Sequence, residues 1–397
     1  MKERILTEKV LGEIKSNLIE KDFKKLGTIL MMLYTFLLNG FYTLNGSVKF
    51  EKQKLILVIC IAIGGVKVVL DFKGKFKERK YSDLLVVSLA LIIGVIFYFH
   101  HTDTRLAIGI LTMICYLYED IDEIIKYFFY SKLFFFIIAI LTGGYMHING
   151  AALHGGMVIL LYVCMKDNKM KWADIATIFI AFLILSLYTD SGSAKIGMIA
   201  TVILLLVVKS KKFIRVYKSK LLTFIYPIIL FINVYFAKCI ELGGQIPYIG
   251  KLLPKKIGEQ IYNVILFLDR ATSSRLTLAA YSLKHLGTSF WGGNVDYSKL
   301  NIGENGYFNL DSGFMWLLQD WGYFMTFIFC IVSIILIYYF IKKEKYNFVI
   351  VAVVIALWGV NEDMLLSVGT NFLFGFALIS VLYFFNEKKI LSNNEKN

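Results

Sequence analysis

Apolar runs long enough to cross a lipid bilayer recur along the whole of this 397-residue chain. Short charged or polar breaks separate the runs. Hydrophobic residues make up 57% of the chain and charged residues only 18%, whereas a soluble domain of this length carries more charge. The pattern therefore predicts an all-α polytopic membrane protein.

The runs and their breaks give about twelve predicted transmembrane helices. Several are shorter than a full crossing, so we expect some of them to be tilted or locally broken. The predicted spans lie near residues 27–46, 54–72, 83–99, 105–119, 129–146, 150–165, 173–189, 195–208, 221–238, 313–341, 346–361 and 364–385.

The basic clusters of the chain fall between alternate predicted spans, as "FKGKFKERK", "KDNKMK", "KSKKFIRVYKSK" and "KKEK". The amphipathic amino terminus (1–26) and the tail (386–397) belong to the same side. The positive-inside rule predicts that these segments are cytoplasmic. One basic loop, "VKFEKQK", falls on the other side and weakens the prediction for the first hairpin. The membrane topology therefore explains the net charge of +14, and a nucleic-acid partner is not needed to account for it.

One predicted extracytoplasmic loop, residues 239–312, is long enough to have structure of its own. It separates the first nine spans (27–238) from the last three (313–385). Within it, "EQIYNVILFLDR" and "SSRLTLAAYSLKHLG" place apolar residues at three- and four-residue spacings. These stretches predict helices that lie on the outer membrane surface or cap a cavity.

The five cysteines are scattered, and four of them lie inside apolar runs, so we expect small core side chains rather than a disulfide framework. The sequence has no Walker loop, zinc-ligand spacing, dinucleotide fingerprint or nucleophile elbow at a plausible place. It therefore predicts neither a metal nor another cofactor.

Two histidines interrupt the apolar stretch "TGGYMHINGAALHGGM" at the predicted outer end of the fifth and sixth spans. His147 is either a turn residue at the lipid headgroup level or part of a functional site. His154 lies one or two turns deeper, where we expect a polar side chain packed inside the bundle.

Two cations stand at predicted helix starts on the same outer side. In "YTDSGSAKIG", Ser191 or Ser193 is the expected N-cap and Lys195 follows in the first turn; in "ATSSRLTL", Ser274 is the expected cap of Arg275. A cation is unfavourable at the positive end of a helix, and a bound anion would offset this cost. Two such sites suit a diphosphate. The alternatives are a snorkelling lysine and an arginine that meets lipid headgroups.

Acidic residues also gather on this side. In "NLDSGFMWLLQDWG", Asp311 is explained by capping of the tenth span, whereas Asp320 lies about two and a half turns further along an apolar helix. An acid at that depth is a functional candidate by default. In "NEDML", Glu362 and Asp363 are most simply solvated charges of a short turn.

With these motifs the chain resembles the O-antigen polymerase and ligase family (Wzy and WaaL type), most closely a capsular or exopolysaccharide repeat-unit polymerase. "GGYMHINGAALHGG" is similar to the family's His-Pro-Asn stretch, with His147 and Asn149 kept and Ile148 in place of proline. "YTDSGSAKIG" resembles its Thr-x-Ser-Arg/Lys stretch. "RLTLAAYSLKHLGTSFWGGN" is similar to its arginine-to-glycine stretch, and "LDSGFMWLLQDWG" to the segment after the loop, where aspartate rather than histidine at 311 favours a polymerase.

The resemblance implies a fold of glycosyltransferase class C type and a bacterial plasma-membrane protein with both termini cytoplasmic. It implies transfer of a growing chain from undecaprenyl diphosphate to a hydroxyl of a new lipid-linked unit, with a flippase and a chain-length regulator as further partners. The cations would stabilise the leaving diphosphate and a carboxylate would act as base. The implied substrate-binding residues are Lys195, Arg275, His147, Asn149 and Ser193, and the implied catalytic residues are Asp311 and Asp320.

Three other functions remain open at this stage. A lipid-linked-oligosaccharide flippase also has about twelve spans, but it is expected to place charges along a central cavity and needs no long outer loop. A membrane acyltransferase would place a histidine and an acid together. An ion-coupled transporter would show broken helices in corresponding halves of the chain. The flippase is the strongest of these alternatives, and the family's ligases remain a further one.

Overall fold

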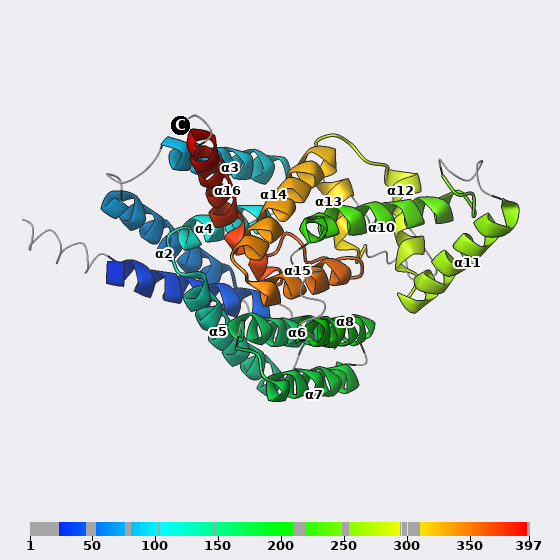
Figure 1. Ribbon diagram of the computed structural model, residues 1–397, viewed down its shortest axis with the longest axis horizontal. Coiled ribbons are helices and arrows are strands. Elements are labelled where there is room, and N and C mark those ends of the chain that lie inside the picture. The colour runs from blue at the N-terminus through cyan, green and yellow to red at the C-terminus, as the bar shows by residue number, and fades with distance from the viewer. Residues whose placement is uncertain are drawn as a thin grey trace, which may run out of the picture.

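The computed structural model is all-helical over the residues that it describes. Its helices pack side by side into a bundle, from which α11 and α12 project at one end (Figure 1). The described residues are 24–44, 53–75, 81–101, 104–143, 145, 148–167, 169–189, 191–209, 219–247, 254–293, 295, 300 and 310–394.

The regular elements follow the apolar runs of the sequence, and each predicted span contains a helix. After the helix Lys24–Leu44 they are α2 (Gln53–Lys75), α3 (Tyr81–His101), α4 (Thr104–Tyr116), α5 (Ile121–Leu141), α6 (Ile148–Met165), α7 (Trp172–Thr189), α8 (Gly192–Lys209), η3 (Lys220–Phe224), α10 (Ile225–Glu241), α11 (Lys255–Ala271), α12 (Arg275–Leu286), α13 (Gly313–Asp320), α14 (Gly322–Lys342), α15 (Tyr346–Trp358), η6 (Phe372–Phe376) and α16 (Ala377–Asn394).

Seven helices in the described part of the chain are long and apolar enough to cross a membrane, which identifies a polytopic membrane protein. They are Lys24–Leu44, Lys54–Phe72, Asp83–His101, Ile121–Leu141, Trp172–Thr189, Lys220–Glu241 and Gly322–Lys342. Shorter apolar helices accompany them at 104–116, 149–165, 346–358 and 372–387. The count of twelve crossings stays a prediction.

The tenth predicted span is broken rather than continuous. Helix α13 ends at Asp320, the chain turns at Trp321, and α14 begins at Gly322 with φ +76°. Glycine is suited to this left-handed conformation because it has no Cβ. The backbone of Ser289–Gly293 fills the break, since Tyr323 N donates to Ser289 O and Gly293 N donates to Asp320 O.

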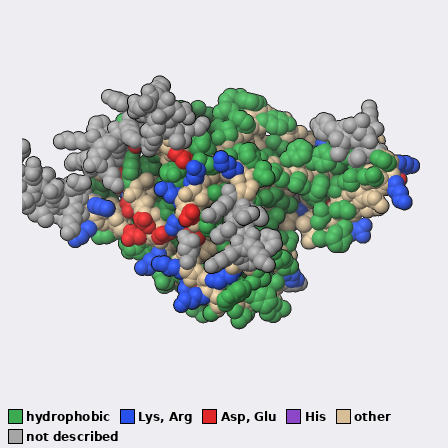
Figure 2. Space-filling view, viewed as in Figure 1, with side chains coloured by type: hydrophobic (Ala, Val, Ile, Leu, Met, Phe, Trp, Pro, Cys, Tyr) green, Lys and Arg blue, Asp and Glu red, His purple; other side chains and the backbone are tan. Residues whose placement is uncertain are grey.

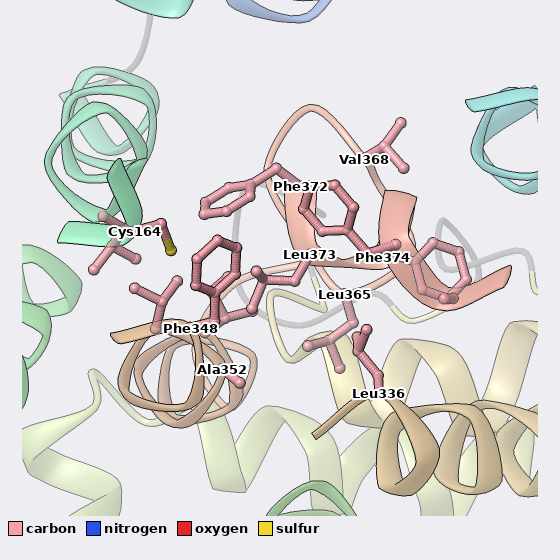
Figure 3. Packing of buried hydrophobic residues seen from close by; sticks show 14 of the residues in the cluster. Cys164, Leu336, Phe348, Ala352, Leu365, Val368, Phe372, Leu373 and Phe374 are labelled. Carbon is pink, nitrogen blue, oxygen red and sulfur yellow. The ribbon is translucent and has the colours of Figure 1, made fainter. Parts of the chain in front are cut away.

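A second break follows α15, which has only 13 residues and is therefore about 20 Å long, shorter than the hydrocarbon core. Residues 359–371 then run without regular helix and are almost entirely buried. Figure 3 shows Leu365 of this stretch, with Phe372 and Phe374 of η6, packed beside Phe348 and Leu336 of neighbouring helices. Irregular backbone inside a helical membrane protein is tolerated where protein surrounds it, and these residues are surrounded by the bundle.

The segments predicted to be cytoplasmic meet at one end of the bundle. Lys345 Nζ lies 2.6 Å from Asp122 Oδ1 and 3.9 Å from Asp167 Oδ2, and Lys209 Nζ donates to Met170 O. Figure 2 shows Lys and Arg side chains gathered toward the end where the Lys24–Leu44 helix begins and again at the tip of α11. Between these regions, over α10 and α12, the visible surface is mostly hydrophobic.

The two amphipathic stretches of the long loop are both helical. Helix α12 packs along α10, where Ala237, Ala279 and Leu318 share a small apolar core. Helix α11 leaves Ile257, Val264 and Phe267 more than one-third exposed. An exposed apolar face of this kind suits a helix that contacts the outer surface of a membrane.

Candidate functional site

Arg275, the first residue of α12, lies between two carboxylates from distant parts of the chain. Its Nη2 atom is 3.0 Å from Asp311 Oδ2, and its Nη1 atom is 3.5 Å from Glu362 Oε1. The side chains of Arg275 and Glu362 are each 13% exposed, and that of Asp311 is 30% exposed. Nη1 makes no hydrogen bond within the described residues. The Glu362 carboxylate balances the charge of this nitrogen without a hydrogen bond to it, so Nη1 has donor capacity for a further oxygen ligand.

A second arginine pairs with the neighbouring acid. Arg105 stands in the first turn of α4, and its Nη1 atom is 2.7 Å from Asp363 Oδ2. Its guanidinium lies 3.9 Å from the ring centroid of Trp316, a cation–π contact. Two arginines and three carboxylates thus form one chain of contacts through the adjacent residues 362 and 363. We call Arg105, Arg275, Asp311, Glu362 and Asp363 the arginine–carboxylate cluster.

The start of α12 is held by an acid of the preceding helix. Asp269 Oδ1 accepts from Thr277 N at 2.9 Å and Asp269 Oδ2 accepts from Thr277 Oγ1 at 2.6 Å. Ser274 has a left-handed backbone (φ +61°) and its side chain caps nothing. The prediction that Ser274 caps α12 is therefore wrong, because the Asp269 carboxylate already satisfies a backbone N–H of the first turn.

Helix capping does not explain Asp311, contrary to the simplest reading of the sequence. The N-cap of α13 is Ser312, whose Oγ accepts from Met315 N, and Asp311 precedes it. The Asp311 carboxylate is therefore turned to Arg275 instead of to the helix. Gly313 allows the close approach of residues 359–362, because a Cβ there would lie 2.7 Å from Glu362 O.

Glu362 and Asp363 are not simply solvated charges, which corrects the sequence interpretation. Both are paired with arginines, and Glu362 is largely buried. The residue that the sequence reasoning missed is Arg105. The signal was present, since Arg105 is a cation at a helix start on the predicted outer side, the feature that singled out Lys195 and Arg275.

Asp320 does not lie deep in a continuous helix, because α13 ends at this residue. Its backbone carbonyl accepts from Gly293 N at 3.0 Å, and a Cβ at Gly292 would lie 2.1 Å from that carbonyl oxygen. Gly292 is thus required for the contact between the long loop and the α13–α14 break. Asp320 is half-buried.

Lys195 stands in the first turn of α8, as predicted, and is exposed. Two residues later, Gly197 touches the indole of Trp358 at the end of α15. Because Trp358 O accepts from Glu362 N, Lys195 lies at the same end of the bundle as the cluster. Helix α15 contacts α8, which carries Lys195. It also contacts α10, and α10 packs against α12, which carries Arg275. Their joint grip on one ligand stays a prediction.

Three candidate residues and the buried His154 remain. His147 and the side chain of Ser193 lie outside the described residues, and Asn149 is exposed in the first turn of α6. His154 is buried in the bundle, as predicted, where its Nδ1 atom is 2.8 Å from Lys132 Nζ. The ring of Tyr145 stacks on it at 5.4 Å between ring centroids.

The arginine–carboxylate cluster is suited to bind an anionic group beside a reacting hydroxyl. The guanidinium groups offer planar forks of donors that match phosphate oxygens. The carboxylates balance the arginines in the absence of an anion, and one of them can accept a proton when the anion is bound. Comparison with protein-family models, curated proteins and solved structures finds no match for this chain.

Proposed function

We propose that this protein polymerises oligosaccharide repeat units linked to undecaprenyl diphosphate, on the outer face of a bacterial plasma membrane, in the synthesis of a capsule, exopolysaccharide or O-antigen. It would be a membrane glycosyltransferase that works without a metal. The observation that carries the proposal is the arginine–carboxylate cluster, which lies where the predicted extracytoplasmic loop joins the membrane bundle.

The substrate chemistry fits the charges of this cluster. A lipid diphosphate places its negative charge at the headgroup level, beside the apolar bundle that receives its tail. Arg275 Nη1 makes no hydrogen bond within the described residues, and Arg105 is paired with Asp363, the chain neighbour of Glu362. Arginine–phosphate contacts are charge-assisted and directional, and they gain strength where water is scarce.

The reaction would proceed by attack of an acceptor sugar hydroxyl on the anomeric carbon of the growing chain. A carbon–oxygen bond forms there as the bond from the anomeric carbon to the diphosphate oxygen breaks. The diphosphate leaves with the bonding electron pair, and Arg275 and Lys195 stabilise its charge. The acceptor proton passes to a carboxylate, for which Asp311 is the candidate because it is the most exposed partner of Arg275. Asp320 is the second candidate for the carboxylate that accepts this proton.

One observation favours a transport function, for which the flippase is the strongest candidate. Unwound backbone at membrane depth, as in residues 359–371, is typical of transporters. The two breaks, at 321 and at 359–371, both lie in the last fifth of the chain and not in corresponding halves. We therefore rank the flippase below the polymerase.

A polymerisation assay tests the proposal. It uses purified protein in lipid nanodiscs, supplied with the lipid-linked repeat unit of the organism that makes the protein. Wild-type protein should build chains of several units, and Arg275→Ala should lower the rate on the order of a hundredfold. Arg270→Ala is the matched control, because Arg270 is exposed on α11 and outside the cluster. Translocation of intact single units in proteoliposomes, with no chain growth from the organism's own unit, would support the flippase instead.

A further inference from the structure

Lys132 is a lysine in the interior of the bundle that has no carboxylate partner in the part of the chain that the structure describes. It lies in the middle of α5 and its side chain is fully buried. Among the described residues its Nζ atom has two partners, His154 Nδ1 at 2.8 Å and Gly369 O at 2.8 Å. A lysine at this depth is expensive, so its position calls for a specific role.

The Gly369 carbonyl belongs to the unwound segment, residues 359–371. This segment has no regular helical ladder, so the carbonyls that its own turns leave unpaired need donors from other elements. Lys132 of α5 supplies the donor for the Gly369 carbonyl. His154 of α6 contacts the same Nζ atom and orients the lysine. Tyr42 closes the other side, because a Cβ at Gly369 would lie 2.2 Å from its ring. Gly369 is thus held by Lys132 of α5 and enclosed by Tyr42 of the Lys24–Leu44 helix, while His154 of α6 binds the lysine.

The unwound segment transmits this anchoring to the candidate site. Within it, Asn371 Nδ2 donates to Leu365 O, and Thr370 Oγ1 lies 3.2 Å from Met364 O. At its amino-terminal end, Glu362 N donates to Trp358 O. Glu362 and Asp363 thus stand on a short, internally bonded stretch whose far end is fixed by Lys132.

We infer that Lys132 and His154 are positioning residues: they hold the unwound segment in place, so that Glu362 and Asp363 face Arg275 and Arg105. The inference rests on the proposed function for its effect on the reaction, whereas the anchoring itself does not. Nζ donates to Gly369 O, and His154 Nδ1 is assigned as the acceptor of a second hydrogen bond from Nζ. With the lysine as an ammonium group, His154 is the neutral tautomer that carries its proton on Nε2.

Thiol labelling of the segment tests the anchoring without any assay of activity. Ser367 is buried in the segment, so Ser367→Cys introduces a nearly isosteric, protected thiol. Adding Lys132→Met removes the donor and keeps the length of the side chain. Loss of a buried hydrogen bond should raise labelling by a membrane-impermeant maleimide about tenfold. Lys126→Met is the matched control on the exposed face of α5, and the parent with serine at 367 gives the background.

The histidine and the reaction rate complete the test. His154→Gln keeps an acceptor oxygen and should preserve protection of the thiol, whereas His154→Leu should lose it. In variants with serine at 367, Lys132→Met should lower the rate of chain growth at least about tenfold, with little change in the KM for the lipid-linked unit. A thiol at 367 that is as protected with Lys132→Met as with Lys126→Met would overturn the inference. If wild-type protein builds no polymer, the proposed function fails while the labelling result still decides the anchoring.

Discussion

Arg275 has two carboxylate partners, and this arrangement decides how the residues of the site can be separated by mutation. Asp311 is the more exposed partner and does not cap α13. Glu362 is more buried and belongs to the unwound segment. A substitution at Asp311 therefore tests proton transfer with little effect on helix stability, whereas a substitution at Glu362 would also disturb the packing.

For Asp311→Asn we expect chain growth to fall by about a hundredfold or more, because asparagine cannot accept a proton. The thermal stability of the purified protein should change little, since Ser312 provides the cap and an ion pair of this exposure contributes about 1 kcal/mol or less. Single-turnover assays and thermal-shift measurements on the same preparation check both statements. An Asp311→Asn protein that polymerises at the parental rate would remove Asp311 from the mechanism.

The two cations should respond differently to exchange. Arg275→Lys is expected to be a poor substitute, because lysine cannot contact Asp311, Glu362 and a phosphate oxygen with one planar fork. Lys195→Arg should be tolerated, because Lys195 is exposed and provides mainly charge. Lys195→Ala should slow chain growth on the order of a hundredfold. Equal rates for Arg275→Lys and wild type would contradict the assignment of Arg275 as a bidentate ligand.

The partners of these residues could not be paired from sequence. Arg105 and Asp363 are separated by 258 positions, and Asp311 and Glu362 lie in different loops. The sequence did place them on one predicted outer side, through the alternation of basic loops. It could not show that this side brings five charges together, because that depends on the break after α15.

At the scale of elements, helix positions followed from apolar runs, but helix ends did not. The sequence "QDWGY" continues an apolar pattern through Trp321, so a continuous span was predicted there. The structure breaks at this point because the loop Ser289–Gly293 occupies the space, an interaction with a part of the chain that hydropathy cannot see. The glycines at 292 and 322 are the local trace of this packing.

Asp269 fixes the start of α12 and, through it, the direction of Arg275. Asp269→Ala removes the two acceptors of Thr277 and should destabilise this region by about 1–2 kcal/mol. Asp269→Asn retains one acceptor oxygen and should lose less. Limited proteolysis between α11 and α12 measures the effect locally, with Glu259→Ala on the exposed side of α11 as control. Identical cleavage rates for Asp269→Ala and the control would show that α12 is held in another way.

At the scale of the whole molecule, two sets of loops meet at two ends of the bundle. The Lys345–Asp122 pair joins segments predicted to be cytoplasmic, and the Arg275–Glu362 pair joins segments predicted to be outside. This separation supports the alternation predicted from the basic loops. The assignment of the ends to the two faces of the membrane rests on the positive-inside rule.

Labelling of single cysteines in intact cells tests this assignment. Lys256→Cys on α11 should react with an impermeant maleimide, and Glu123→Cys at the start of α5 should react only after the cells are opened. Both positions are exposed, and the native cysteines are buried or partly buried. Reaction at 123 but not at 256 in intact cells would reverse the orientation and remove the site from the outer face.

The central claim is that the arginine–carboxylate cluster binds a lipid diphosphate, and equilibrium binding measures this without a requirement for turnover. The titration uses undecaprenyl diphosphate without sugar, added to wild-type, Arg275→Ala, Arg105→Ala and Arg270→Ala proteins in nanodiscs. We expect Kd to rise about tenfold or more for Arg275→Ala and Arg105→Ala, because each loses a charge-assisted contact. The Kd of Arg270→Ala should stay unchanged. The same Kd for Arg275→Ala and wild type would contradict the account.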